Sequence, residues 1–187
     1  MQTANVSPGK PRVNGAVFRA PVGTVVPTDC VSALAEAFKD LGYVSDAGMT
    51  NSNTAEKTQV YAWGGNQVMN ATSKKPDTFT ATFIEALNPN VLKTVYGDAH
   101  VIVNENGKTI TVEATSDDPE YASYVIDMAL KGGAMKRIVI PKGELSEMGE
   151  IVYKDDEPIG YKLTIAALDD GSGKTHYEYI KLPEAAS

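Results

Sequence analysis

The chain has 187 residues, of which 42% are hydrophobic and 22% are charged, a composition typical of one globular domain with its own core. Its formal net charge of −7 argues against a protein that binds nucleic acid through clustered Lys and Arg. A single cysteine excludes an intrachain disulfide, and no apolar run is long enough for a signal peptide or a membrane helix.

Both ends of the chain are polar, and we expect them to lie outside the folded domain. Residues 1–14 are rich in Pro and Gly and predict a flexible amino-terminal arm, and residues 184–187 predict a frayed tail. Residues 15–183 are expected to form one domain. It begins with a short strand over residues 16–20, which Pro21 ends.

Residues 29–41 have the pattern of an amphipathic helix. Thr28 or Asp29 suits the helix start, and Gly42 suits a left-handed end. Apolar residues recur at helical spacing and would pack on a sheet. These apolar residues are Val31, Leu34, Ala35, Phe38 and Leu41.

The next segment predicts strands separated by polar stretches. Strand patterns cover residues 43–45, 58–63, 67–71 and 78–83, and the glycines after Trp63 predict a turn.

A second, shorter helix is predicted after Asn88. Asn is a good helix cap, Pro89 is favoured at the first helical position, and Gly97 suits the end.

From residue 99 onward the pattern is strands and turns. Asn106-Gly107, Gly132-Gly133 and the acidic stretch 155–158 each predict a turn between two strands. Successive hairpins indicate antiparallel pairing. The sequence therefore predicts an α+β, mainly β fold of nine or ten strands. It is an antiparallel sandwich or partly closed barrel with one flanking helix and a second short helix.

The stretch GSGKT at residues 171–175 resembles the end of a phosphate-binding loop. That motif needs a glycine at position 168, which is Leu168, and it needs a helix to follow. Strand-like patterns flank the stretch at 161–165 and 176–182 instead. We therefore predict a hairpin turn and no nucleotide cofactor.

Residues with catalytic potential are few and scattered. Cys30, His100 and His176 have no partners at metal-ligand or nucleophile spacing, so we predict neither a metal site nor catalysis. The paired acids fall at predicted turns, where Asp hydrogen-bonds its own backbone. Trp63 is the only tryptophan, and we favour an interface anchor over a sugar platform for it.

Three passages taken together resemble one family. They are FRAPVGTVVPTD…LAEAFKDLGYVSDAGMT (18–50), QVYAWGGNQV (59–68) and TFIEALNPNVLKTVYGD (82–98). In this order they resemble the tail tube protein, the major tail protein of long-tailed non-contractile bacteriophages. The resemblance covers roughly residues 15–170 and includes no catalytic motif.

The resemblance implies a structural virion protein and not an enzyme. Such proteins form usually hexameric rings that stack around a tape measure protein, and DNA later passes through the tube without specific binding. Further implied partners are a tail terminator, distal tail or baseplate proteins and assembly chaperones, in the host bacterial cytoplasm and with no membrane. A long loop, here expected within residues 46–77, would reach the adjacent ring.

Five residues are candidates for contacts between subunits by loop position and side-chain type. Residues 175–182 place mixed side chains on both faces, as suits an edge strand that pairs with a neighbour. The candidates are Asp46, Tyr61, Trp63, Tyr177 and Tyr179.

Other functions remain open at this point. One alternative is a tail terminator or baseplate hub of the same fold, and a terminator would form a single ring. Another is a carbohydrate-binding β-sandwich that uses Trp63, Tyr61 and Asn66, which would bind glycans as a monomer. An enzyme ranks last, because no acid, base and nucleophile converge in the pattern.

Overall fold

The computed structural model describes residues 6–12, 15–104 and 106–183, so the predicted tail at 184–187 and part of the predicted arm at 1–14 lie outside the described residues. It contains one α-helix, α1 (Pro89–Tyr96), and two 3-10 turns, η2 (Asp98–His100) and η3 (Lys131–Gly133). The strands are β1 (Lys10–Pro11), β2 (Val17–Pro21), β3 (Lys39–Asp40), β4 (Val44–Ser52), β5 (Glu56–Tyr61), β6 (Gln67–Lys74), β7 (Thr78–Phe83), β8 (Val101–Val103), β9 (Ile110–Val112), β10 (Ala122–Ala129), β11 (Met135–Met148), β12 (Tyr161–Ala167) and β13 (Tyr177–Lys181).

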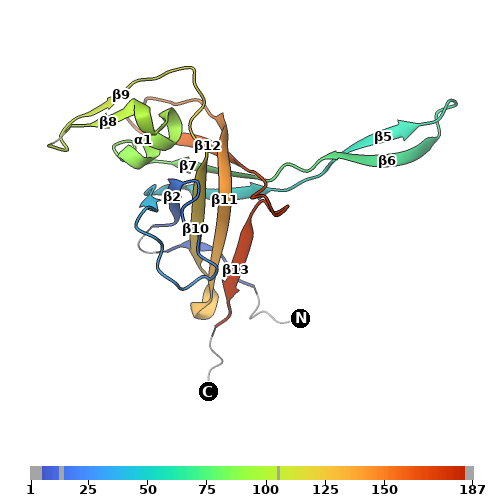
Figure 1. Cartoon of the computed structure of the whole chain (residues 1–187), viewed down its shortest axis with the longest axis horizontal. Helices are drawn as coiled ribbons and strands as arrows, with labels where there is room; N and C mark the ends of the chain where they lie inside the picture. The colour runs from blue at the N-terminus through green and yellow to red at the C-terminus, as the bar shows by residue number, and fades with distance from the viewer. Residues whose placement is uncertain (1–5, 13–14, 105, 184–187) are drawn as a thin grey trace.

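One antiparallel sheet of nine strands forms the body (Figure 1). Its strand order is β3-β2-β10-β11-β12-β7-β4, with β1 paired to β10 and β13 paired to β11. The predicted mainly β, antiparallel class is therefore confirmed. The sheet is open, because β3 and β4 at the two ends of the strand order do not pair with each other and so do not close a barrel.

The predicted second helix is confirmed as α1. The side chain of Asn88 accepts a hydrogen bond from the Asn90 N–H, Pro89 occupies the first turn, and the Gly97 N–H donates to the carbonyl of Lys93. Gly97 has a φ of 92°, which favours glycine. The apolar side of α1 lies in the main core against the sheet.

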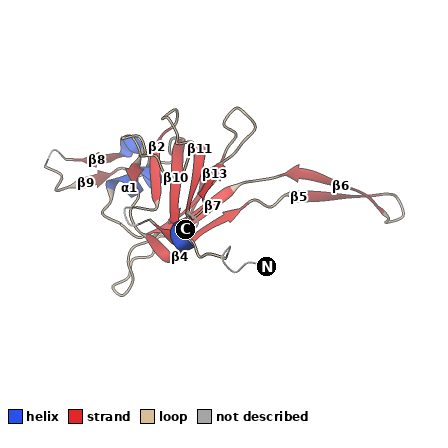
Figure 2. Cartoon of the chain, turned by 90° about the horizontal axis from the view of Figure 1, so that it is seen from below, coloured by secondary structure: helices blue, strands red, loops and turns tan. Residues whose placement is uncertain are grey.

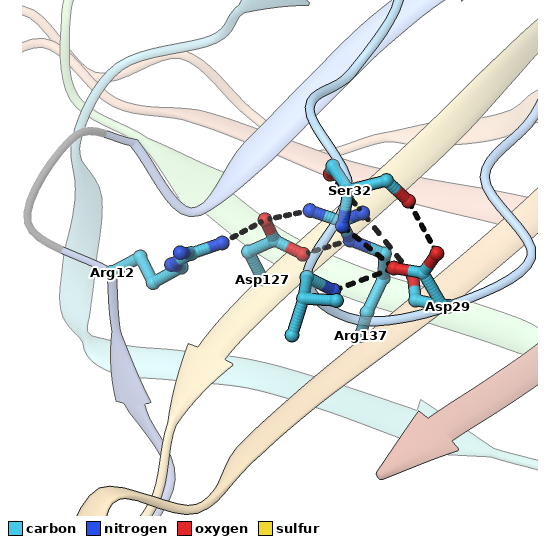
Figure 3. Close-up of polar contacts among 6 residues, drawn as sticks. Arg12, Asp29, Ser32, Asp127 and Arg137 are labelled. Carbon is cyan, nitrogen blue, oxygen red and sulfur yellow. Dashed lines mark hydrogen bonds and ion pairs between the residues drawn. The ribbon is translucent and has the colours of Figure 1, made fainter. Parts of the chain in front are cut away.

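The predicted flanking helix over residues 29–41 is wrong, although its cap signal is real. The Asp29 carboxylate accepts hydrogen bonds from the Val31 and Ser32 N–H groups, as a helix cap would. However, the guanidinium of Arg137 donates to the carbonyls of Asp29 and Ser32 at 3.2 and 2.9 Å (Figure 3). Those carbonyls, which would accept the first helical bonds, are bonded to Arg137, and residues 29–38 form an irregular loop that leads into β3.

Arg137 also holds the loop to a buried acid. Its guanidinium forms two hydrogen bonds with the Asp127 carboxylate, at 2.6 and 2.7 Å, and Arg12 contacts the same carboxylate at 3.2 Å. Arg137 is 1% exposed and Asp127 is 4% exposed. The hydrogen bonds that Arg137 donates to Asp127 raise the pKa of Arg137, so the guanidinium stays charged in the interior.

The predicted hairpin between β12 and β13 is wrong in its pairing. Both strands pair with β11, which is 14 residues long: Gly143–Met148 pair with β12, and Met135–Val139 pair with β13. Residues 168–176 carry the chain from one segment of this strand to the other. The turn predicted at 155–158 also lacks a strand before it, because residues 150–154 lie outside the strands.

Apolar side chains form two cores on opposite faces of the sheet. The main core lies between the sheet and α1, and the second lies under the loop that follows β2. Strand β10 contributes to both, so Ala122–Asp127 are all buried. The second core contains Ala20, Phe38, Val125 and Val139, with Phe18, Val26, Leu34, Tyr177 and Tyr179 packed against it.

Two hairpins project from the body in opposite directions (Figures 1 and 2). Strands β5 and β6 form the longer one, which we call the arm, and β8 and β9 form the shorter one next to α1. The arm pairs as a separate two-stranded sheet between β4 and β7 of the body.

Candidate assembly surfaces

The arm carries exposed apolar side chains, and its charged residues, Glu56, Lys57 and Lys74, all lie where it joins the body. Residues 58–73 include no Asp, Glu, Lys, Arg or His, although 22% of the whole chain is charged. Soluble hairpins usually protect themselves with charges, so an exposed uncharged one indicates a contact surface. The exposed large apolar residues here are Val60, Tyr61, Trp63, Val68 and Met69.

The tip of the arm presents Trp63. The Ala62 N–H donates to the carbonyl of Asn66 at 2.8 Å, and the Gly65 N–H donates to that of Ala62 at 3.0 Å. Gly64 and Gly65 have φ values of 112° and 88°, as a tight turn requires. Trp63 is completely exposed, so its ring is free to bury surface against a partner.

The root of the arm contains a buried carboxylate. Asp77, 4% exposed, accepts hydrogen bonds from Asn51 at 2.9 Å and from the Thr175 hydroxyl at 2.6 Å, and the Nδ1 of His176 contacts it too. Burial raises the pKa of Asp77, but the bonds from Thr175, Asn51 and His176 outweigh it and leave the pKa below its ordinary value. The carboxylate is therefore ionised and fully partnered.

An Asp–His contact also occurs in catalytic triads, but the third partner is placed differently here. In a triad the nucleophilic hydroxyl donates to the imidazole. Here the Thr175 hydroxyl donates to Asp77, on the same oxygen that His176 contacts. This geometry fixes side chains and activates no nucleophile.

The GSGKT segment uses its backbone N–H groups internally. Asp169 accepts from Gly171 and Gly173 at 2.7 and 2.9 Å, and Asp170 accepts from the Ser172 N–H at 2.8 Å. A phosphate site would point such groups at its ligand. The hydroxyl of Tyr177 donates to Asp170 and is the main cause of the lowered pKa of that carboxyl. The segment is thus a turn whose backbone N–H groups are hydrogen-bonded by its own aspartates.

A hydroxyl-rich face covers the half of the sheet made by β12, β7 and β4. Register places Thr50, Thr80 and Thr164 in one row across the three strands. The Thr80 and Thr164 hydroxyls are 3.0 Å apart. The alternating burial of β7 shows that this face is opposite the main core. Its side chains on β7 are half-buried, and it also carries the exposed Lys162, in register with Thr82.

The five candidate interface residues fall into three separate places. Tyr61 and Trp63 lie together on the arm, and Asp46 lies exposed on β4, at the end of the strand order. Tyr177 and Tyr179 lie on β13, with parallel rings 6.3 Å apart that pack on the second core. One copy does not join these places into one surface.

Sequence reasoning missed other residues of these surfaces. Val68 and Met69 could have been found, because they belong to the uncharged run. Asp77 gave no signal, since its partners Thr175 and His176 are nearly one hundred positions away in the chain.

Comparison with known proteins identifies the family of this chain. A family model described as phage tail tube protein matches residues 11–186. No curated protein matches the chain. Within the described residues, no helix is long and apolar enough to cross a membrane. The chain therefore belongs to the phage tail tube protein family, whose members are structural components of the virion tail and not enzymes.

Proposed function

We propose that copies of this protein form rings, usually of six, that stack into the hollow tail tube of a long-tailed, non-contractile phage and later conduct DNA. The observation that carries the proposal is the outer part of the arm, residues 58–73, which has no charged residue and carries the exposed Trp63 at its tip. An isolated two-stranded hairpin is marginally stable in water, so its apolar side chains suit burial against another subunit. The arm lies within residues 46–77, the segment expected to reach the adjacent ring.

Contacts within a ring would use the open edges of the main sheet. In the described residues β4 and β13 each pair with only one strand, β7 and β11 respectively. Strands at a sheet edge can add a strand from a neighbour through backbone N–H and C=O groups. Asp46 lies on the first of these strands, and Tyr177 and Tyr179 lie on the second.

The hydroxyl-rich face of β12, β7 and β4 suits the lumen. Threonine hydroxyls carry no charge and offer no apolar surface that would hold the cargo, and Lys162, in register with Thr82, adds an exposed positive charge to this face. A tape measure protein and then DNA could slide past without specific binding. A tail terminator, distal tail or baseplate proteins and assembly chaperones complete the partners, and residues 15–183 form the domain that they contact.

Electron microscopy of Trp63→Ala tests the proposal. The wild type should form tubes across a concentration series, with light scattering rising in parallel, because buried tryptophan is a typical interface anchor. Trp63→Ala should stay folded and form no long tubes. Tyr153→Ala is the matched control, because it removes another exposed aromatic side chain, in the loop between β11 and β12, and should leave assembly unchanged.

Three results would contradict this assignment. Single wild-type rings that never stack would favour a tail terminator. Saturable glycan binding by a monomer would favour a carbohydrate-binding module. Normal tubes from Trp63→Ala would place the contact between rings elsewhere than the arm.

A further inference from the structure

The arm is joined to the body by two short connections. Pairing between β4 and β7 ends at Ser52 and Thr78, and pairing between β5 and β6 begins at Glu56 and Lys74. No strand ladder runs through the residues between these two points. The direction of the arm therefore depends on the contacts made where the connections meet the body.

Asp77 lies at this junction and binds both sides of it. Asn51, which precedes the arm, donates to the Asp77 carboxylate and also to the Thr78 carbonyl at 3.1 Å. The Asp77 carbonyl accepts from the Ala167 N–H at 2.8 Å, which ties the returning chain to the end of β12. The entering and leaving chains of the arm are thus held to each other and to the body.

The same carboxylate reaches the segment that leads into β13. Thr175 donates to it and His176 contacts it, and the His176 ring packs edge-on against Phe79, with centroids 5.2 Å apart. The internally hydrogen-bonded turn at residues 169–174 immediately precedes these two residues and positions them. This gives the GSGKT stretch a structural task that its resemblance to a phosphate loop concealed.

We propose that Asp77 is the positioning residue of the arm, and that it couples the direction of the arm to the segment before β13. One buried carboxylate with three side-chain partners acts as a cross-link between parts of the chain that are far apart in sequence. Its removal leaves the polar groups of Asn51, Thr175 and His176 without their acceptor. The importance of this direction for tube assembly rests on the function proposed above.

A distance measurement on the monomer tests directly whether Asp77 fixes the direction of the arm. Spin labels at Asn66→Cys on the arm tip and Lys162→Cys on β12, in a Cys30→Ala background, report the arm direction by pulsed electron resonance. The parent should give a single narrow distance, and Asp77→Ala should lose it. Asp29→Ala is the matched control, because it removes a carboxylate with several hydrogen bonds whose partners, Val31 and Ser32, lie in the loop after β2.

The outcomes distinguish a specific role of Asp77 in the arm direction from a general loss of rigidity in the fold. A narrow distance in Asp77→Ala, or equal broadening in Asp29→Ala, would overturn the proposal. If Asp77→Ala fails to fold, Thr175→Val and Asn51→Ala remove single partners and should each broaden the distance. Because the labels are read on monomers, absence of wild-type tubes would count against the proposed function alone. Loss of the narrow distance in Asp77→Ala together with normal tubes would show that assembly does not need the arm direction to be fixed by Asp77.

Discussion

The two halves of the main sheet are covered differently. The half formed by β2, β10 and β11 has the main core on one face and the loop after β2 on the other, so Ala122–Asp127 are buried without interruption. In the half formed by β12, β7 and β4, buried and half-buried residues alternate along Thr78–Phe83. The first half is built to hold the fold together, and the second leaves a face, an edge and the arm free for partners.

The half formed by β2, β10 and β11 contains a buried ion pair because the loop that covers it has no regular backbone pairing. A loop without helical or strand pairing must satisfy its carbonyls in another way. Arg137 does this for Asp29 and Ser32 while paired with Asp127. In the open half the buried Asp77 holds the irregular segment before β13, through Thr175 and His176.

The largest effect should come from breaking the covered half at Arg137. Arg137→Met leaves Asp127 buried without its main partner, and removal of one member of a buried pair typically lowers the free energy of unfolding by about 3–5 kcal/mol. Urea unfolding measures this. The control is Lys136→Met, the next residue on β11, whose half-exposed ion pair with Glu178 should contribute about 0–1 kcal/mol. Equal losses in both variants would show that Arg137 does not hold the loop.

An intermediate effect should appear in acid. The hydroxyl and N–H of Ser32 and the N–H of Val31 lower the pKa of Asp29 from 3.8 to about 2. A folded-state pKa below the unfolded one means that this stabilisation is complete above the unfolded value and is lost as pH falls through the folded one. The melting temperature should therefore fall between pH 3.8 and about 2. Asp29→Asn should flatten that part of the curve, and an unchanged curve would contradict the cap.

The smallest effect should come from the open face. Thr80→Val keeps the shape of the side chain and removes one half-exposed hydroxyl contact, so the free energy of unfolding should change by at most about 1 kcal/mol. Chemical denaturation measures this. Phe79→Ala, one position away but 2% exposed in the main core, should lose about 3–5 kcal/mol. Comparable losses would mean that the Thr face is as tightly packed as the core.

Local signals predicted the elements whose stability is local. Asn88, Pro89 and Gly97 bound α1 through contacts within a few residues, and glycine turns predicted the arm and the β8–β9 hairpin. The helix over 29–41 failed because Arg137, about a hundred positions away, takes its first carbonyls. The partner of β13 and the partners of Asp77 were beyond prediction for the same reason: pairing across the whole chain leaves no periodic pattern.

The exposed tip of the arm also makes the protein its own optical reporter. Trp63 is the only tryptophan among 187 residues, so all indole fluorescence arises from one position. In the free subunit its ring is surrounded by water and should emit at the long wavelengths of a solvated indole. Burial of the ring against another copy would shift the emission to shorter wavelengths, and the time course of assembly could then be followed without a label.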